Sequence, residues 1–480
     1  MVATAAHLHD EQTQIAHLQD VFNKQKAAYA KAPYPSYRQR VEDLNKLDKA
    51  LRDFQHELAE AINQDFSCRS KDETLLAEVM IALESIKYNR KHLKKWMKPE
   101  RRHVSVLFAP ASNKVHYQPK GVVGIMVPWN YPIQLAAAPL AAALAAGNRA
   151  VIKLSEFTPA TNEVLQRMFA SAFDEDQVAV VLGEAQVGAE FSSLHWDHLL
   201  FTGSTAVGRH VMSAAGKNLV PVTLELGGKS PCIITDNATL KGAAESIIFG
   251  KATNAGQTCI APDYILCPES MVEALKSHIK AAYAHSFPTL RDNPDYTAIV
   301  NDRQFSRLQS YLKDAEEKGA TIEALNTANE DFSETRKIPL SLVTNTTDDM
   351  VIMQDEIFGP LLPIVTYSSL DEAISYINQR PRPLALYLFS HNSSEQDQVL
   401  KNTIAGGVAI NDCLTHIAQD DMPFGGVGDS GIGAYHGKEG FLTFSHAKSV
   451  HKKGRINSGK LIHAPHGRLM HRLIYKYVLR

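Results

Sequence analysis

The 480-residue chain has few cysteines, no long apolar run and little net charge, and each absence excludes a class of protein. Its five cysteines form no CxxC pair, which excludes a zinc ribbon or disulfide scaffold and favours a reducing cytoplasm. The longest apolar run, residues 133–146, contains Gln134 and Pro139 and is shorter than the ~20 residues of a membrane span. Polar residues interrupt positions 1–14, so we expect no signal peptide. A net charge of −2 gives no case for nucleic acid as the main partner.

The sequence also lacks any metal-binding pattern. Its twenty histidines are scattered, and those in the basic tail have neither metal-ligand spacing nor acidic partners. Cys232, Cys267 and Cys413 lie on strand-like runs, so we predict inert core thiols there. We therefore assign no metal.

Regular alternation of strands and helices predicts two α/β regions, in a chain long enough for two or three domains. Apolar strands of this kind form parallel sheets that helices cover on both faces. In the first region we expect strands at 121–127, 150–153, 178–182, 198–201 and 221–226, with helices at 132–146, 159–172, 184–193 and 206–215. In the second we expect strands at 231–235, 262–267, 299–301, 361–366, 384–389 and 408–411, with helices at 239–252, 270–285, 303–318, 370–378 and 394–402.

The segments outside these regions have weaker patterns. Residues 10–63 predict two helices broken near Pro33, and 75–97 predicts a third with Leu76 on its inner side. Residues 101–118 predict a protruding hairpin, which either pairs with another subunit or lies on its own chain. The seven glycines of 423–440 predict a loop.

The C-terminal segment is strongly basic. Residues 441–480 hold nine Lys or Arg and no Asp or Glu. An apolar helical stripe runs through Leu469, Met470, Leu473, Ile474, Tyr477 and Val478. Such a helix either docks on a partner subunit, which we favour, or lies on an anionic membrane surface.

Glu225 and Cys259 frame the stretch on which the functional prediction rests. Glu225 ends an apolar run before two glycines, so its carboxylate can lean into a dry pocket and accept a proton. Cys259 lies on a loop of small and polar residues, where a thiol can attack a carbonyl and backbone N–H groups can hold the oxyanion. This pair favours a thioester that is then hydrolysed. Without its flanking sequence, a core thiol and a surface carboxylate would be the simpler interpretation.

The flanking sequence resembles the aldehyde dehydrogenase superfamily over roughly residues 20–450. Six motifs match in the family's order, at 128–132, 201–205, 224–231, 256–260, 356–360 and 423–427. The motif at 224–231 contains Glu225, and the motif at 256–260 contains Cys259. Residues 431–446 are similar to the typically dimeric class 3 branch, and 29–36 and 65–70 to bacterial coniferyl aldehyde dehydrogenases. The resemblance implies an α/β fold with a Rossmann-like parallel-sheet cofactor domain, an α/β catalytic domain and a small β oligomerisation arm.

This fold implies a division of the chain. We expect residues 1–98 and 121–226 to form the NAD-binding domain and 227–414 the catalytic domain. Residues 99–120 and 415–480 would form the arm and the tail, and the protein would be a cytoplasmic homodimer.

No GxGxxG motif is present, so the cofactor site depends on other residues. Gly203, Ser204 and Gly208 open a helix whose amides can bind a pyrophosphate, although such turns are often only structural. Lys153 and Glu156 are placed to hold the adenosine ribose, unless they form an ordinary surface ion pair; the Glu156 charge favours NAD over NADP. NADP stays possible, because some class 3 relatives tolerate it.

The resemblance assigns the remaining contacts. It implies that Glu356 holds the nicotinamide-side ribose with Phe358 beside it, and that the Asn130 amide and the Cys259 N–H form an oxyanion hole. Each of these motifs has an alternative interpretation as a structural turn.

These roles predict oxidation of an aldehyde to its carboxylic acid by NAD(P), with Glu225 activating water. Coniferyl aldehyde, other aromatic aldehydes and medium or long aliphatic aldehydes are the candidate substrates. A semialdehyde-specific or acylating dehydrogenase is the first alternative, against which the presence of Glu225 argues. A non-catalytic protein of the same fold is the second.

Overall fold

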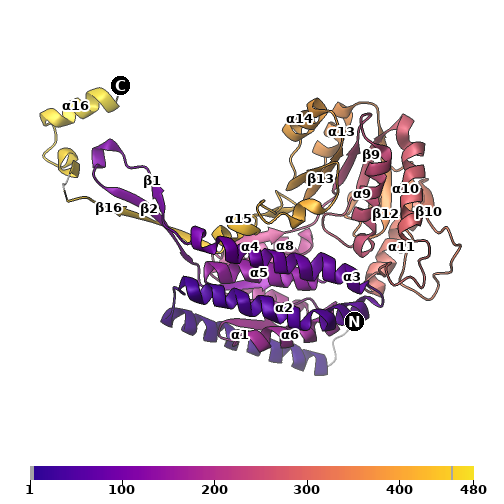
Figure 1. Cartoon of the computed structure of the whole chain (residues 1–480), viewed down its shortest axis with the longest axis horizontal. Coiled ribbons are helices and arrows are strands. Elements are labelled where there is room, and N and C mark those ends of the chain that lie inside the picture. Colours follow the sequence, from indigo (N-terminus) through magenta and orange to yellow (C-terminus); the bar gives the residue numbers. More distant parts are fainter. Residues whose placement is uncertain (1–4, 456–457, 480) are drawn as a thin grey trace.

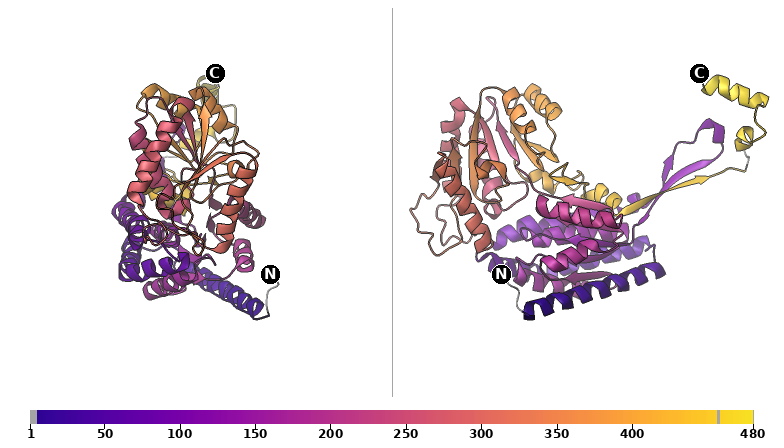
Figure 2. Two further views of the ribbon diagram at one scale, coloured as in Figure 1. Left: turned by 90° about the vertical axis from the view of Figure 1, so that its right-hand side faces the viewer. Right: turned by 180° about the vertical axis from the view of Figure 1, so that it is seen from behind.

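The computed structural model describes residues 5–455 and 458–479. Two α/β lobes stand side by side, and a β arm projects from one of them to carry the C-terminal helix away from both (Figures 1 and 2). The six-stranded sheet of one lobe and the seven-stranded sheet of the other confirm the predicted α/β architecture.

The first lobe is built on a six-stranded sheet of order β15-β7-β6-β3-β4-β5. All neighbours are parallel except β15, which lies antiparallel to β7. Its strands are β3 (Val122–Met126), β4 (Arg149–Lys153), β5 (Val178–Val181), β6 (His198–Thr202), β7 (Val222–Glu225) and β15 (Gly431–Ile432). The helices between them are α5 (Pro132–Ala146), α6 (Pro159–Ala172), α7 (Ala185–Ser193) and α8 (Thr205–Lys217). The carboxyl ends of parallel strands lie at one edge of the sheet, so Lys153, Thr202 and Glu225 share that edge.

The second lobe holds a seven-stranded sheet of order β10-β11-β12-β9-β8-β13-β14. Only β10 is antiparallel to its neighbour. Its strands are β8 (Pro231–Ile234), β9 (Tyr264–Pro268), β10 (Thr321–Ala324), β11 (Ser341–Thr344), β12 (Leu361–Tyr367), β13 (Ala385–Phe389) and β14 (Gly407–Ile410). Its helices include α9 (Leu240–Ala252), α10 (Val272–Ser286), α11 (Asp302–Glu317), α12 (Val351–Gln354), α13 (Leu370–Asn378) and α14 (Ser393–Asn402).

The strand predicted at 299–301 is wrong. Ile299 is buried, but its N–H donates to Arg336 O, and the Val300 N–H donates to the Gln257 side chain. The segment is a buried loop whose backbone groups are satisfied outside any sheet.

Helices at the N-terminus cover the first lobe. α1 (Ala5–Lys31) and α2 (Tyr37–Phe66) are followed by α3 (Lys71–Thr74), the π-helical turn η1 (Leu75–Met80) and α4 (Ile81–Trp96). Leu76, predicted to face inward, is 59% exposed, because the extra residue of the π turn rotates it out of the core-facing stripe.

The arm is a three-stranded antiparallel sheet, β1 (Glu100–Arg102), β2 (Ser112–Pro119) and β16 (Ser445–Lys452). The predicted hairpin of β1 and β2 therefore also pairs with the C-terminal segment of its own chain through β16.

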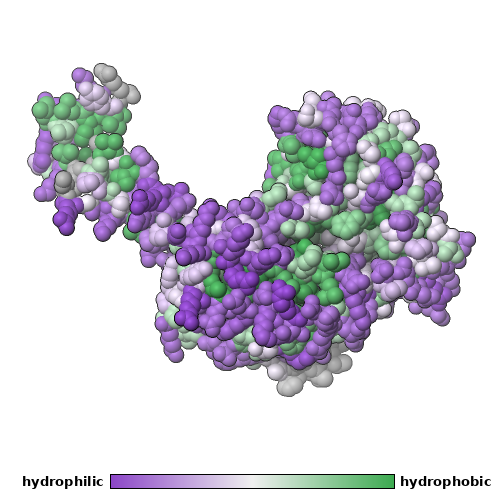
Figure 3. All heavy atoms as spheres, viewed as in Figure 1, coloured by the Kyte–Doolittle hydropathy of each residue, from purple (hydrophilic) through white to green (hydrophobic). Residues whose placement is uncertain are grey.

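The prediction of a loop over all of 423–440 is wrong at two places, because the range contains strand β15 and the start of a helix. Helix α15 (Gly437–Thr443) begins inside that range, at a glycine with φ +49° that lies against the Asp420 carbonyl. Beyond β16, α16 (Leu469–Val478) bears the apolar residues that Figure 3 shows gathered at the tip of the arm.

Candidate active site

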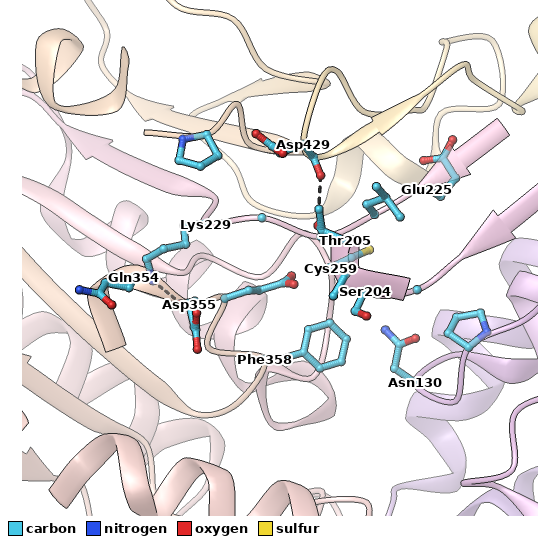
Figure 4. A pocket seen from close by; sticks show the side chains of 18 of the residues that line it. Asn130, Ser204, Thr205, Glu225, Lys229, Cys259, Gln354, Asp355, Phe358 and Asp429 are labelled. Carbon is cyan, nitrogen blue, oxygen red and sulfur yellow. Dashed lines mark hydrogen bonds between the residues drawn. The ribbon is translucent and has the colours of Figure 1, made fainter. Parts of the chain in front are cut away.

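A cavity of about 960 Å³ lies between the two lobes. Seven residues predicted for the site line it: Asn130, Gly203, Ser204, Glu225, Cys259, Glu356 and Phe358. Figure 4 shows the labelled side chains around this space, on elements from both lobes. The six- and seven-stranded sheets thus each supply part of one site.

The Cys259 loop has an unusual backbone. After α9, Asn254 and Ala255 have φ of +51° and +50°, followed by Gly256 at +72°. A Cβ at Gly256 would lie 2.5 Å from Gly359 O, so only glycine fits there. The Gln257 side chain fixes the loop, because its Nε2 donates to Ala298 O at 3.1 Å and its Oε1 accepts from Val300 N at 3.0 Å. These contacts maintain a strained turn that presents Cys259 to the cavity.

The surroundings of Cys259 disfavour ionisation of its thiol. Burial raises the pKa of Cys259 to about 12, and the Glu356 and Glu225 carboxyl groups add to the rise. Reaction at neutral pH therefore requires a change in the charge or the solvation around the sulfur.

Glu225 ends β7 opposite Thr202 of β6 and Gly431 of β15. It is 3% exposed, and neither carboxylate oxygen has a hydrogen-bond partner. Burial raises its pKa well above the usual range. A desolvated carboxyl group with free oxygens is suited to take a proton from water.

Asn130 lies two residues before α5, directly after Pro128 and Trp129, and is 3% exposed. Its Nδ2 donates one hydrogen bond to Gln257 O at 3.1 Å. Because an amide nitrogen has two hydrogens, the second stays available to the cavity. Its own carbonyl accepts from Arg69 Nη1 at 2.9 Å and Asn254 Nδ2 at 3.1 Å, which fixes the residue from behind.

The turn after β6 provides backbone donors. Ser204 caps α8 by accepting from the Val207 N–H at 3.4 Å, and the first-turn amides of α8 face the cavity edge. A Cβ at Gly203 would lie 2.5 Å from the Phe201 ring, so a side chain there would be crowded. The end of a helix with free N–H groups is suited to a phosphate.

Glu356 lies across the cavity, close to the backbone of Gly227. A Cβ at Gly227 would lie 1.9 Å from the Glu356 carboxylate, so any residue larger than glycine at position 227 would clash with it. Burial raises the pKa of Glu356 to about 8, and the nearby Asp263 adds to the rise. Its Oε1 has no hydrogen-bond partner. Phe358 packs edge-on against Trp129 with ring centroids 5.4 Å apart.

Three predicted cofactor residues do not line this cavity. Lys153 and Glu156 lie at the carboxyl end of β4, where Lys153 Nζ is 3.2 Å from Glu156 Oε2. Gly208 lies one turn into α8, where a Cβ would be 2.6 Å from Leu226, so its position serves helix packing.

Several residues at the site were not predicted from the sequence. Lys229 and Asp263 form a buried ion pair beside Glu356, and Arg307 donates to Ile357 O at 2.8 Å. Arg69 lies behind Asn130. Charged side chains are rarely buried. The sequence does not show that these residues are buried, or which partners they contact.

Within residues 5–455 and 458–479, no helix is long and apolar enough to cross a membrane. Over the same residues, no group of three or more His, Cys, Asp or Glu side chains could hold a metal ion.

The sequence and the fold are both similar to those of aldehyde dehydrogenases. Residues 6–450 match the aldehyde dehydrogenase family. A probable coniferyl aldehyde dehydrogenase of Pseudomonas aeruginosa is 55% identical over the full length of both chains, which confirms the resemblance to that group. A substrate-bound aldehyde dehydrogenase structure from Staphylococcus aureus superposes with a TM-score of 0.90 at 41% identity, covering 96% of this chain and 99% of that one. A mutant betaine aldehyde dehydrogenase of Staphylococcus aureus in complex with NAD+ has a TM-score of 0.82 at 26% identity, covering 92% and 89%.

Proposed function

This chain belongs to the aldehyde dehydrogenase family, and we propose that it oxidises an aldehyde to the carboxylic acid while reducing NAD(P). One observation carries the proposal: Cys259, Glu225 and Asn130 line a single cavity with complementary roles. A nucleophile, a base with free oxygens and an amide donor are the groups that acyl chemistry at a thiol requires.

The nucleophile is the Cys259 thiolate, which remains after the thiol gives its proton to water. It bonds to the aldehyde carbon and gives a thiohemiacetal whose oxygen carries the developing negative charge. The free Nδ2 hydrogen of Asn130 and the Cys259 N–H hold that oxygen. Removing one such donor typically costs a factor of ~10²–10³ in rate.

The residues around the cavity fit a dinucleotide. The unpartnered Glu356 Oε1 can accept from a ribose hydroxyl, Gly227 leaves room for the Glu356 carboxylate itself, and the α8 amides suit a pyrophosphate. A bound nicotinamide would supply the hydride acceptor, and loss of hydride from the thiohemiacetal carbon would leave a thioester on Cys259. Lys153 and Glu156 would hold the adenosine ribose, and the Glu156 carboxylate disfavours a 2′-phosphate, so NAD is preferred.

Glu225 acts in the second half of the reaction. It takes a proton from water, the hydroxide oxygen bonds to the thioester carbon, and the C–S bond breaks to release the acid and the Cys259 thiolate. A carboxyl group whose pKa is raised is a stronger base once ionised. This step distinguishes the enzyme from an acylating dehydrogenase, which would pass the acyl group to another acceptor.

Coniferyl aldehyde is the substrate we favour, because the Pseudomonas aeruginosa relative that matches over its full length is named for it. Other aromatic and medium or long aliphatic aldehydes are the remaining candidates. A cytoplasmic enzyme suits a free Cys259 thiol, since a reducing compartment keeps it active.

A homodimer is the assembly we favour. β16 forms a free edge of the arm, with every position after Ser445 exposed, and β14 forms a free edge of the seven-stranded sheet. Such edges are suited to pairing with another chain. The exposed apolar side chains of α16 would then dock on the partner subunit; contact with an anionic membrane surface is the alternative.

Product analysis tests the proposal. Purified protein is mixed with coniferyl aldehyde and either NAD or NADP, and NADH formation is compared with the free acid released. We expect one acid for each NADH without coenzyme A or phosphate. NADH formation that requires coenzyme A would indicate an acylating enzyme, and no turnover on any aldehyde would contradict the proposal.

A further inference from the structure

Behind Asn130 lies a buried charge cluster of Arg69, Glu73 and Glu78. Arg69 is 1% exposed and its guanidinium lies between the Phe66 and Tyr131 rings, at 5.3 and 4.9 Å from their centroids. Its Nη1 is 3.1 Å from Glu78 Oε1, and its Nε is 3.5 Å from Glu73 Oε1. Because burying a charge is costly, such a cluster calls for a specific role.

Both acids lie on the helical segment that follows Arg69 in the chain. Arg69 lies in the short connection between α2 and α3, and Glu73 lies in the first turn of α3, where its Oε1 comes within 3.5 Å of Arg69 Nε. Glu78 lies further along the same helical segment, in the π-helical turn η1, and its Oε1 reaches Arg69 Nη1. Local insertions of this type in helices are frequent at functional sites.

Each acid of the cluster holds a backbone segment of the proposed active site. Glu78 Oε2 accepts from the N–H groups of Ile133 and Gln134, at 2.8 and 3.2 Å, at the start of α5. Glu73 Oε1 accepts from the Asn254 N–H at 3.0 Å, in the strained turn before Cys259. The two acids therefore tie the helix that follows Asn130 to the loop that bears the nucleophile.

Arg69 completes the connection at Asn130 itself. Its Nη1 donates to Asn130 O at 2.9 Å, and Asn254 Nδ2 donates to the same oxygen at 3.1 Å. Asn254 Nδ2 and Asn130 Nδ2 both donate to Gln257 O, each at 3.1 Å. The Asn130 side chain is thus oriented by a closed set of hydrogen bonds that Arg69 anchors.

We propose that Arg69, fixed by Glu73 and Glu78, is a positioning residue that aims the Asn130 amide at the reacting oxygen. This inference rests on the proposed function, in which Asn130 stabilises the oxyanion. Arg69 touches neither substrate nor cofactor and acts only through Asn130. A displacement of about 1 Å in such a donor can cost ~10²-fold in rate.

Arg40 offers a matched control. It is as buried as Arg69 and contacts the C-terminal end of α5, where its Nη1 donates to Ala145 O and Ala146 O at 3.1 and 2.7 Å. Arg40 has no contact with Asn130 or with the Cys259 loop among its hydrogen bonds. Its replacement tests what loss of a buried arginine against α5 does by itself.

The experiment compares Arg69→Lys with Arg40→Lys in the full-length enzyme. Lysine keeps the charge but not the planar guanidinium, whose Nη1 donates to Asn130 O and lies 3.1 Å from Glu78 Oε1. We expect Arg69→Lys to lower kcat about tenfold or more with little change in the aldehyde KM, since the lost contact acts on the transition state. Arg40→Lys is expected to keep kcat within about twofold at a similar loss of melting temperature.

A double-mutant cycle with Asn130→Ala separates positioning from general destabilisation. If Arg69 acts through Asn130, Arg69→Lys has almost no further effect on kcat in the Asn130→Ala protein. An equal fall of kcat in both backgrounds, or an equal fall from Arg40→Lys, would overturn the inference. A fully active Asn130→Ala protein would instead refute the oxyanion role, and the inference with it. If Arg69→Lys does not fold, Glu73→Gln serves in the same cycle, because it keeps an oxygen for Asn254 N.

Discussion

The Asp263 carboxylate accepts a hydrogen bond of 2.9 Å from the N–H of Ile357, the residue that follows Glu356. Its other oxygen pairs with Lys229, whose Nζ also donates to Ile352 O and Asp355 O at 2.7 and 2.9 Å. A single buried ion pair therefore fixes the backbone on both sides of Glu356. Catalytic and binding side chains in this site depend on buried contacts of this kind.

Asp263→Asn should weaken cofactor binding more than aldehyde binding. The variant keeps an oxygen for Ile357 N but leaves Lys229 buried without its counter-ion, which typically costs about 3–5 kcal/mol of stability. We expect a lower melting temperature and a several-fold higher KM for NAD, with the aldehyde KM nearly unchanged. Steady-state kinetics and thermal unfolding measure both.

Glu330→Gln is the control for this prediction. Glu330 also holds two backbone amides, of Leu290 and Arg291, but it lies outside the cavity. Its loss should lower stability without changing the NAD KM. An equal change of KM in both variants would show that Asp263 acts through stability alone.

Glu225→Gln should stop the reaction after one turnover. Without a base, water attacks the thioester slowly, and general-base catalysis typically contributes ~10²–10⁴-fold. We expect a burst of about one NADH per active site, followed by a slow steady state, and an acyl adduct on Cys259 by mass spectrometry. Cys259→Ala should give neither burst nor adduct. A normal steady-state rate in Glu225→Gln would exclude its role as the base.

Much of the fold could be predicted from the sequence, because buried parallel strands are apolar runs between turns. The helices predicted at 132–146 and 159–172 have the same bounds as α5 and α6. The sequence could not exclude a strand at 299–301, because Ile299 and Val300 are as apolar and as buried as the residues of a core strand. Whether such a run pairs with a neighbour depends on where its backbone partners lie.

Only part of the candidate site could be predicted from the sequence. Glu225, Cys259 and Asn130 lie within local motifs, and the cavity brings all three together. Arg69 and Asp263 act on partners 61 and 94 positions away, Asn130 and Ile357. Contacts of that range are set by the packing of whole elements, so no short pattern marks them.

The reactivity of Cys259 should depend on Glu356 in a pH-dependent way. Glu356, with a pKa of about 8, is ionised at pH 9 and protonated at pH 7. Its negative charge raises the pKa of the Cys259 thiol, so its removal lowers that pKa and increases the thiolate fraction. Glu356→Gln should therefore be alkylated several-fold faster than the wild type at pH 9, and at nearly the same rate at pH 7.

Iodoacetamide labelling followed by mass spectrometry measures these rates in the ligand-free protein. Cys259→Ala corrects for labelling at Cys68, which is partly exposed, whereas the other three cysteines are buried. A rate ratio that is the same at pH 7 and pH 9 would show that charge on Glu356 does not control the thiol.

The choice between NAD and NADP should depend on Glu156. Its carboxylate lies 3.2 Å from Lys153 Nζ at the carboxyl end of β4, where the adenosine ribose would bind. Glu156→Gln removes a charge that would repel a 2′-phosphate, an interaction worth roughly 1–2 kcal/mol at a half-exposed site. We expect kcat/KM for NADP relative to NAD to rise about tenfold. Glu163→Gln removes an equal charge from the exposed face of α6 and should leave the ratio unchanged. If both variants shift the ratio equally, long-range charge rather than a direct contact sets the preference.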